Sequence, residues 1–209
     1  MSANFSAKPN QGEVKPFDRA DYPLANSERI QLMFGSCAIE VLENDPGIRV
    51  SSLYSNHEGA RVNRTFAVVA YPRVIEHAFR EEHDAIVSGQ SIGTLFKERG
   101  WVLEKRHLYF GELDMQADLF ETAAQASDRS IRPAIHVYTL VIKKLDSHFE
   151  YASIAEIHHP DFLRLDDLVK IYGPVDAGAA SDHDRLHGFL TTVEKRIKAI
   201  VALRHQAQP

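Results

Sequence analysis

The sequence predicts an α+β fold, with a largely antiparallel β-sheet flanked by helices. Two observations carry this prediction. Two pairs of strand-like segments are each joined by a short turn, and helical segments lie between these pairs and at both ends of the chain. Short turns join antiparallel neighbours, because a parallel pair needs a crossover of about a dozen residues or more. The two hairpins therefore form the predicted sheet, and the helices cover it.

The first half of the chain is predicted to contain two helices and the first hairpin. Ser27 is a suitable N-cap, and apolar residues recur at helical spacing from there to Gly35. Residues 37–43 are expected to form a second, short helix. Apolar and turn-forming residues then predict the hairpin, with a turn at 44–47, a strand at 48–55, a turn at 56–59 and a strand at 61–70.

The rest of the chain is predicted to contain three more helices and the second hairpin. One helix follows Pro72 and ends at Gly89, and another, at 91–99, ends at Gly100. Strands are expected at 101–112, 134–145 and 151–159, with a turn at 146–148. An amphipathic helix at 184–204 has an apolar stripe of Leu186, Phe189, Leu190, Val193, Ile197, Ile200 and Val201.

The chain is expected to hold a single domain at 21–209, preceded by a flexible arm at 1–20. A length of 209 residues suits one domain of ordinary to generous size. The first 20 residues are rich in Ser, Ala, Asn, Gln, Lys and Pro and show little apolar periodicity.

Composition excludes several classes of protein. The 24 basic and 29 acidic side chains give a formal charge of -5, which disfavours binding to the phosphate backbone of a nucleic acid. No apolar run approaches the roughly 20 residues that cross a bilayer, and the N-terminus has no apolar core of a secretory signal. The single cysteine, Cys37, cannot form an internal disulfide. We therefore expect a cytoplasmic protein with no membrane and no nucleic-acid partner.

Arg64 and Glu156 each lie in line with apolar residues of a predicted strand. Arg64 alternates with Val62 and Phe66, and Glu156 follows Ile154 at a spacing of two. A charge on an apolar face is costly unless it is paired or meets a ligand. One interpretation is an edge strand or a simple ion pair. The other is a pocket lined by the sheet, with an arginine for an anion and a carboxylate for a proton or a hydroxyl group.

Cys37 also has two interpretations. It follows Gly35-Ser36 at the expected start of a helix, where the helix dipole would stabilise a thiolate. No signature of a cysteine hydrolase surrounds it, so the alternative is a small buried hydrophobic side chain.

The histidines raise the question of a metal hydrolase. His183 and His187 have the i, i+4 spacing of zinc ligands on a helix, but the residue after His183 is Asp184 rather than the glutamate of metalloproteases. No third ligand is evident, and His158 and His159 alternate across a strand, so both cannot face one ion. We therefore predict no metal site.

Motifs for nucleotides and serine hydrolysis are absent from the sequence. It contains neither the Walker A pattern nor G-x-G-x-x-G, and it has no G-x-S-x-G elbow.

Five segments lie in order along roughly residues 27–165: GSCAIEVL (35–42), RVSSLYSNHEGARVNRT (49–65), AVVAYP (67–72), GQSIGTLF (89–96) and ASIAEIHHP (152–160). In this order they resemble segments of the chorismate lyase (chorismate–pyruvate lyase) family. In that family an arginine begins a strand, a polar turn follows, and Arg-Thr lies on the returning strand. A Pro-Leu-Gly segment and a strand with an essential glutamate come later. Here Arg49 begins the strand, Arg64-Thr65 lies on the returning strand, Ser91-Ile92-Gly93 replaces Pro-Leu-Gly, and Glu156 matches the glutamate. The family also has a strand before the arginine, for which only residues 43–48 remain here, so its presence is open.

The resemblance implies a chorismate lyase-like fold with an enclosed pocket between sheet and helices. It also implies a carbon–oxygen lyase that needs no metal and no other cofactor, and that removes pyruvate from chorismate to leave 4-hydroxybenzoate. Its partner would be this anionic small molecule, and the protein would be a monomer or a homodimer. The implied site residues are Arg49 for the ring carboxylate, Ile92, Gly93 and Cys37 as pocket lining, Glu156 for the ring hydroxyl and proton transfer, and Arg64 as a second anion contact or a partner of Glu156.

The chemistry of these residue types agrees with this implication. Chorismate is a dianion, and the guanidinium fork matches a carboxylate bidentately. A carboxyl group in a dry pocket, with a pKa raised by desolvation, is a plausible partner for proton transfer.

The alternative is a non-catalytic module that binds an aromatic acid. The same fold resembles the ligand-sensing (UTRA) domains of bacterial transcription regulators. Those regulators carry an N-terminal winged helix, for which residues 1–26 are too short and irregular. The sequence therefore favours the enzyme, although likeness of fold alone does not establish activity.

Overall fold

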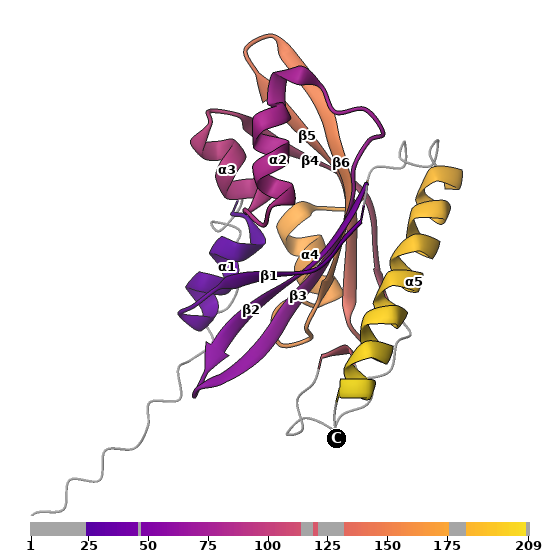
Figure 1. Ribbon diagram of the computed structural model, residues 1–209. Coiled ribbons are helices and arrows are strands. Elements are labelled where there is room, and N and C mark those ends of the chain that lie inside the picture. Colours follow the sequence, from indigo (N-terminus) through magenta and orange to yellow (C-terminus); the bar gives the residue numbers. More distant parts are fainter. Residues whose placement is uncertain (1–23, 46, 114–118, 121–131, 176–182, 208–209) are drawn as a thin grey trace, which may run out of the picture.

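A six-stranded antiparallel sheet forms the centre of the protein, in the order β1-β2-β3-β6-β5-β4 (Figure 1). The computed structural model describes residues 24–45, 47–113, 119–120, 132–175 and 183–207. The strands are β1 (Ala38–Asp45), β2 (Ile48–His57), β3 (Ala60–Ala70), β4 (Val102–Glu112), β5 (Ala134–Lys144) and β6 (Ser147–His158). The predicted α+β class, with an antiparallel sheet flanked by helices, is confirmed.

Helices cover both faces of this sheet. The described helices are α1 (Asn26–Phe34), η2 (His77–Phe79), α2 (Arg80–Val87), α3 (Ile92–Glu98), α4 (Leu165–Tyr172) and α5 (His183–Ala207). In Figure 1, α5 runs along one side of the sheet, and α1, α2 and α3 lie on the other side. Side-chain packing places α4 on the side of α1, because Leu168 and Ile171 join one apolar cluster with Ile30 and Leu53.

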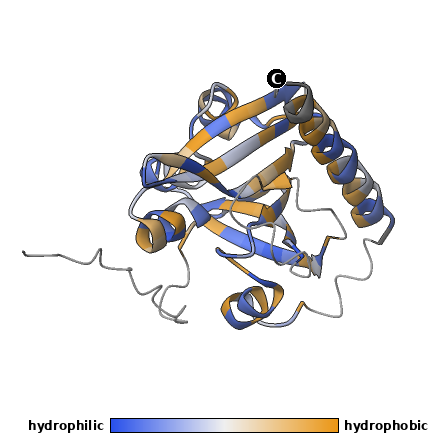
Figure 2. Ribbon diagram, turned by 90° about the horizontal axis from the view of Figure 1, so that it is seen from below, coloured by the Kyte–Doolittle hydropathy of each residue, from blue (hydrophilic) through white to orange (hydrophobic). Residues whose placement is uncertain are grey.

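The face under α5 is a continuous apolar core. Alternate residues of the central strands, among them Phe66 and Ile157, pack there with Val193 and Ile197 of α5. Figure 2 shows that apolar and polar residues alternate along α5. The apolar ones predicted as a stripe pack against this core. Burial of each such side chain stabilises the fold by about 1.5–3 kcal/mol relative to exposure.

An aromatic cluster attaches η2 and α3 to the opposite face. Phe79, Phe96 and Trp101 contact one another edge to face, with ring centroids 5.9–6.4 Å apart. Phe79 and Phe96 also contact Tyr151 of β6 at 5.6 and 4.8 Å. Such pairs contribute about 0.5–1.5 kcal/mol each beyond their buried area, so they hold these helices firmly on the sheet.

The expected short helix at 37–43 is wrong, because these residues belong to β1. The register with β2 shifts between Val41 and Glu43, so Leu42 is the extra residue of a bulge. The bulge breaks the strict alternation of a strand and leaves apolar residues at 39, 41 and 42, a spacing that resembles a helical turn. β1 also supplies a strand before Arg49, whose presence the sequence left open.

Two further features differ from the sequence prediction. The second hairpin is tighter than expected, because β6 begins at Ser147 and Leu145, with φ 55°, occupies the turn. Helix α4 was not predicted, although Asp166 and Asp167 lie in its first turn and Gly173 ends it.

The expected arm at 1–20 lies outside the described residues. Within the described part of the chain, no helix has the length and apolar character that crossing a membrane requires.

Candidate functional site

A cavity of about 560 Å³ lies between the sheet and the helices of the α1 side. Its floor is formed by β2, β3, β6, β5 and β4, and α1, α3 and α4 contribute the other walls. Most of the lining is apolar. The floor residues are Arg49, Ser51, Leu53, Ala67, Val69, Ile154, Glu156, Tyr138, Leu140, Leu103 and Lys105.

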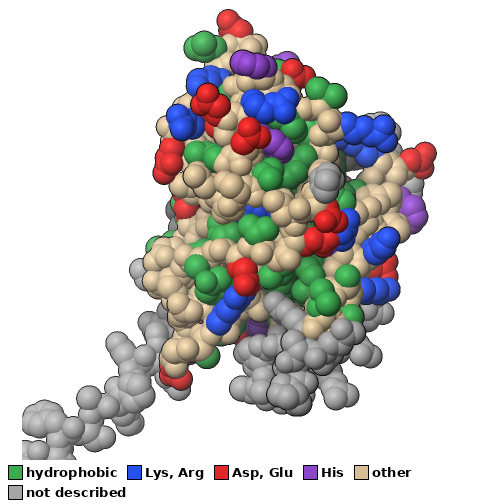
Figure 3. Space-filling model, viewed as in Figure 1, with side chains coloured by type: hydrophobic (Ala, Val, Ile, Leu, Met, Phe, Trp, Pro, Cys, Tyr) green, Lys and Arg blue, Asp and Glu red, His purple; other side chains and the backbone are tan. Residues whose placement is uncertain are grey.

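The cavity opens to solvent at one end. Lys97, Glu104 and Lys143 line it there, and each keeps 43–48% of its side chain exposed. The described residues therefore do not seal the cavity. Figure 3 shows basic and acidic side chains interspersed over the face of the molecule seen in this view.

Arg49 is a buried cation on the cavity floor. It is 2% exposed, and its Nη1 atom donates hydrogen bonds to the carbonyl oxygens of Ile86, at 2.9 Å, and Gln90, at 3.0 Å. Its Nε atom is buried without a hydrogen-bond partner. No described carboxylate forms an ion pair with this guanidinium. A buried arginine without a counter-charge is costly, so this position is suited to an anionic ligand.

Glu156, on β6, is the acidic counterpart in the cavity floor. The carboxylate is 3.3 Å from Lys105 Nζ and 3.7 Å from His136 Nδ1. Burial by itself raises the pKa of Glu156, but Lys105, His158 and the Asn26 side chain together bring this pKa below its ordinary value. The expectation of a carboxyl group with a raised pKa is therefore wrong, and Glu156 is ionised at neutral pH.

Strand register places Arg49 and Glu156 on the same face of the sheet. Arg49 pairs with Val69, which pairs with Ile154, two residues before Glu156. Two strand spacings and an offset of two residues put the Cα atoms of Arg49 and Glu156 roughly 12 Å apart. A ligand lying on this floor can therefore meet the guanidinium at one end and the carboxylate at the other.

Lys105 is a charged side chain of the cavity floor that the sequence analysis did not identify. Its ammonium group lies 4.3 Å from the Tyr138 ring centroid and 5.5 Å from that of Tyr172. Burial would lower the pKa of Lys105, but the adjacent Glu156 carboxylate raises it above its usual value. The available signal was a lysine alternating with Leu103 and His107 on one face of a predicted strand.

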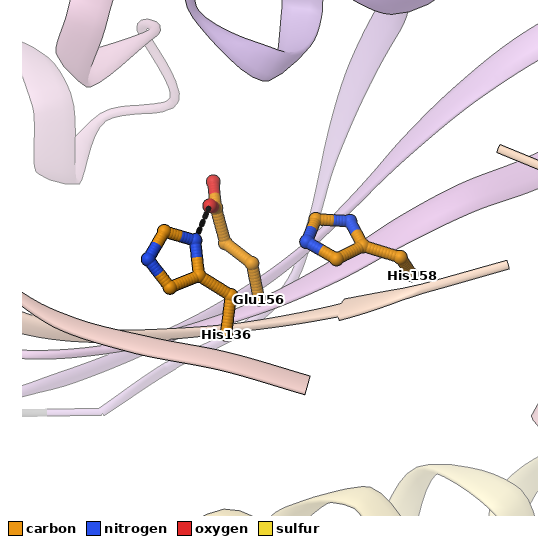
Figure 4. Close-up of side chains that lie close together, drawn as sticks. All are labelled: His136, Glu156 and His158. Carbon is orange, nitrogen blue, oxygen red and sulfur yellow. Dashed lines mark ion pairs between the residues drawn. The ribbon is translucent and has the colours of Figure 1, made fainter. Parts of the chain in front are cut away.

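Two buried histidines flank the Glu156 carboxylate (Figure 4). His136 and His158 are both 0% exposed. His136 Nε2 is 2.9 Å from His107 Nδ1, and His158 Nδ1 is 3.1 Å from Thr65 Oγ1. The remaining nitrogens, His136 Nδ1 and His158 Nε2, have no hydrogen-bond partner among the described residues.

The two imidazoles and the carboxylate could hold a metal ion, since one donor atom from each lies within 4.8 Å of the others. Burial lowers the pKa of His158 to about 4, and it also lowers the pKa of His136 well below its ordinary value. Both rings are therefore neutral at neutral pH. The sequence offered one signal, His136 in the otherwise apolar start of the segment AIHVYTLVI.

Ile92 and Gly93 line the cavity at the start of α3, as the resemblance implied. Ser91 caps this helix, because its Oγ atom accepts a hydrogen bond from Thr94 N at 3.4 Å. The cap fixes where α3 begins and so brings these two residues to the cavity wall.

Arg64 has neither of its two expected roles. The register of β3 with β2 passes from Thr65 to Asn63 over one step, so Arg64 is the extra residue of a bulge and leaves the alternation. Its Nε atom donates to Ser55 Oγ at 2.9 Å, and its guanidinium lies 3.6 Å from the Phe34 ring centroid. Arg64 is therefore a packing residue outside the cavity.

Cys37 is also outside the cavity lining. It precedes a strand instead of a helix, so it does not lie at a helix N-terminus that would stabilise a thiolate, and it packs against the cluster of Ile30 and Phe162. Burial raises the pKa of this thiol to about 11. The interpretation as a small hydrophobic side chain fits these observations, and the expected role in lining the pocket does not.

The histidines considered from sequence lie in different parts of the molecule, and His158 lies beside the cavity floor. His187 is exposed on α5, and the side chain of His183 lies outside the described part of the structure. His159 Nδ1 accepts a hydrogen bond from Asp161 N at 3.0 Å, whereas His158 faces Glu156.

Comparison with known proteins yields no family for this chain: it matches no protein-family model, and no curated protein is significantly similar to it.

Proposed function

We propose that the protein is a carbon–oxygen lyase that removes pyruvate from chorismate, or from a closely related enolpyruvyl ether, and leaves a hydroxybenzoate such as 4-hydroxybenzoate. The observation that supports this proposal most is Arg49, a buried guanidinium without a described carboxylate partner, in the same cavity as Glu156. A chorismate lyase-like fold, a cytoplasmic location and a monomer or homodimer belong to the same proposal.

Substrate binding follows from the charges on the cavity floor. In the proposal, Arg49 takes the ring carboxylate through its remaining N–H donors, because a planar guanidinium suits a carboxylate. The ring lies over the apolar side chains of Val69, Leu140 and Ile154. The Lys105 ammonium is a second cation on the cavity floor and is available to a dianion.

The elimination needs two proton movements and no oxidant. The ether bond between the ring and the enolpyruvyl oxygen breaks, and its electron pair leaves with the enolpyruvate. The ring carbon that bears the hydroxyl group loses its proton, the ring becomes aromatic, and the enolpyruvate takes up a proton to become pyruvate. Glu156, being ionised, accepts the hydroxyl hydrogen bond and serves the proton removal, and Lys105 is the adjacent acid.

The second candidate is a module that binds an aromatic acid without turnover. The ion pair between Lys105 and Glu156 favours it, because a carboxylate engaged by an ammonium group is less available as a base. Both candidates use Arg49 as the anion contact.

The test is an assay of purified protein with chorismate in the presence of a chelator, following pyruvate and the absorbance of the aromatic product. We expect Glu156→Gln to abolish turnover while binding is retained, and Arg49→Ala to weaken binding by about 2–5 kcal/mol. Arg64→Ala is the matched control, because it removes a buried arginine outside the cavity, and its turnover should equal that of the wild type.

Three results would count against the proposal. Binding of the acid without release of pyruvate would favour the binding module. Wild-type activity in both Glu156→Gln and Arg49→Ala would exclude these residues as the site. Equal losses in Arg49→Ala and Arg64→Ala would indicate a general effect of removing a buried arginine.

A further inference from the structure

We propose that His136, Glu156 and His158 form a binding site for a first-row divalent metal ion at the base of the cavity (Figure 4). This inference goes beyond the proposed elimination, which requires no metal.

The donor atoms are close to the spacing that such an ion imposes. His136 Nδ1 is 3.7 Å from Glu156 Oε2, and the three donor atoms lie within 4.8 Å of one another. A tetrahedral ion with bonds of about 2.0–2.1 Å holds its ligand atoms roughly 3.4 Å apart. Side-chain movements of about an ångström therefore suffice to close the three donors around an ion.

The hydrogen bonds of the two histidines point to the same role. Buried polar atoms are nearly always satisfied, yet one nitrogen of each ring has no partner among the described residues, and in both rings it is the nitrogen near Glu156. The other nitrogen of each ring is held by His107 or by Thr65. Metal-bound histidines show this division, in which the outer nitrogen is anchored and the inner one binds the ion.

The donor set determines the class of ion. Two neutral imidazoles and one carboxylate are ligands for Zn²⁺ and for Fe²⁺, whereas Mg²⁺ and Ca²⁺ prefer oxygen donors alone. Glu156 lines the cavity, so an oxygen atom of a cavity ligand can complete the coordination of the ion. The ligand class that fits is an acid or hydroxy acid, whose oxygen the ion would polarise.

Lys105 is the competing cation at this site. Its ammonium lies 3.3 Å from the Glu156 oxygen that also faces His136, so the ammonium and a metal ion cannot both stay there without strong repulsion. Lys105 lines the cavity, and a flexible four-carbon chain carries its ammonium group, so this group can turn toward the cavity. Metal binding therefore displaces the ammonium, and removal of the ammonium should strengthen metal binding.

The experiment is a titration of chelator-stripped protein with Zn²⁺ in competition with a chromophoric chelator, repeated with Co²⁺, whose visible spectrum reports coordination. We expect one equivalent to bind. His136→Gln and His158→Gln should each weaken binding at least about 10–100-fold, and Lys105→Met should strengthen it about tenfold or more. His187→Gln removes the exposed histidine considered from sequence and should leave the Zn²⁺ affinity unchanged.

Circular dichroism checks that each variant is folded. A milder variant, Thr65→Val, removes only the hydroxyl group that lies 3.1 Å from His158 Nδ1. This variant should stay folded, bind Zn²⁺ about tenfold more weakly and change the Co²⁺ spectrum. The inference is overturned when the wild type binds no Zn²⁺, when His158→Gln and Thr65→Val bind it as well as the wild type, or when only His187→Gln loses binding. Pyruvate release by the chelator-treated protein tests the lyase separately.

Discussion

The two faces of the sheet differ in the side chains that they bury. Under α5, the central strands present apolar residues such as Val68, Ala155 and Ile157. On the cavity side, the intervening residues include Arg49, His136, Glu156 and His158, all at most 7% exposed. Successive residues of a strand point to opposite faces, so each of these strands contributes to both environments.

The difference shows how the fold supports a costly polar site. Buried charges and unsatisfied nitrogens destabilise a protein by several kcal/mol unless partners or ligands compensate. The apolar face under α5 supplies stability that does not depend on a ligand. The cavity face can therefore keep buried polar groups without loss of the fold.

The largest loss of stability should come from Phe66→Ala on the α5 face. This ring is fully buried and lies 5.2 Å from the Phe120 ring centroid. We expect the free energy of unfolding in urea to fall by about 3–5 kcal/mol. Leu203→Ala on the exposed side of α5, where Leu203 is 65% exposed, should change it by about 0.5 kcal/mol or less. A loss of less than about 1 kcal/mol in Phe66→Ala would contradict the role given to this face.

A somewhat smaller effect is expected from Lys105→Met on the cavity face. The substitution leaves Glu156 buried without its ammonium partner and should cost about 3 kcal/mol at neutral pH, measured with a chelator present. Burial raises the pKa of Glu156 and the Lys105 ammonium opposes this effect, so in the variant the loss should shrink as the pH falls and the carboxyl group takes up a proton. The double variant with Glu156→Gln should recover most of the loss, and additive losses would argue against the pair.

Arg64→Ala should reduce stability without affecting the cavity. The change removes the hydrogen bond to Ser55 and the stacking on Phe34, together worth about 1–2 kcal/mol. Chemical denaturation measures this loss, and calorimetric titration with chorismate, the proposed ligand of Arg49, should give the same affinity as the wild type. A weaker affinity would place Arg64 back among the anion contacts.

The smallest effect on ligand binding is expected from chemical modification of Cys37. With a pKa of about 11, this thiol is almost wholly protonated at pH 8. Alkylation followed by mass spectrometry should therefore be slow at pH 8 and should accelerate about tenfold per pH unit up to the pKa. Labelled protein should bind the acid as well as unlabelled protein does. Rapid alkylation at pH 7 would show that the thiol is activated.

Sequence reasoning was sufficient for what depends on local pattern. The hairpins around 56–59 and 146–148, the helices that end at Gly89 and Gly100 and the long amphipathic C-terminal helix all follow from apolar periodicity and turn residues. Arg49, Ile92, Gly93 and Glu156 line one cavity, although their positions came from a resemblance and their roles stay a prediction.

The rest depended on register, which a single sequence does not reveal. A bulge at Leu42 disguised β1 as a helix, and a bulge at Arg64 turned that side chain away from the apparent core face. Lys105 and His136 belong to different strands from Glu156, and pairing across the sheet brings them to its carboxylate. The same applies to the partner of His158, Thr65.

The hydrogen bonds of Arg49 have a consequence for residues that never touch a ligand. One guanidinium nitrogen joins the carbonyl groups of Ile86 and Gln90, and the chain between them turns at Gly89, whose φ of 120° suits glycine alone. This turn orients the arginine, so the acid that we propose to bind there would stabilise the turn. A side chain introduced at position 89 should therefore weaken the binding of that acid to Arg49. By thermodynamic reciprocity, binding of the acid should slow amide exchange in the segment between α2 and α3.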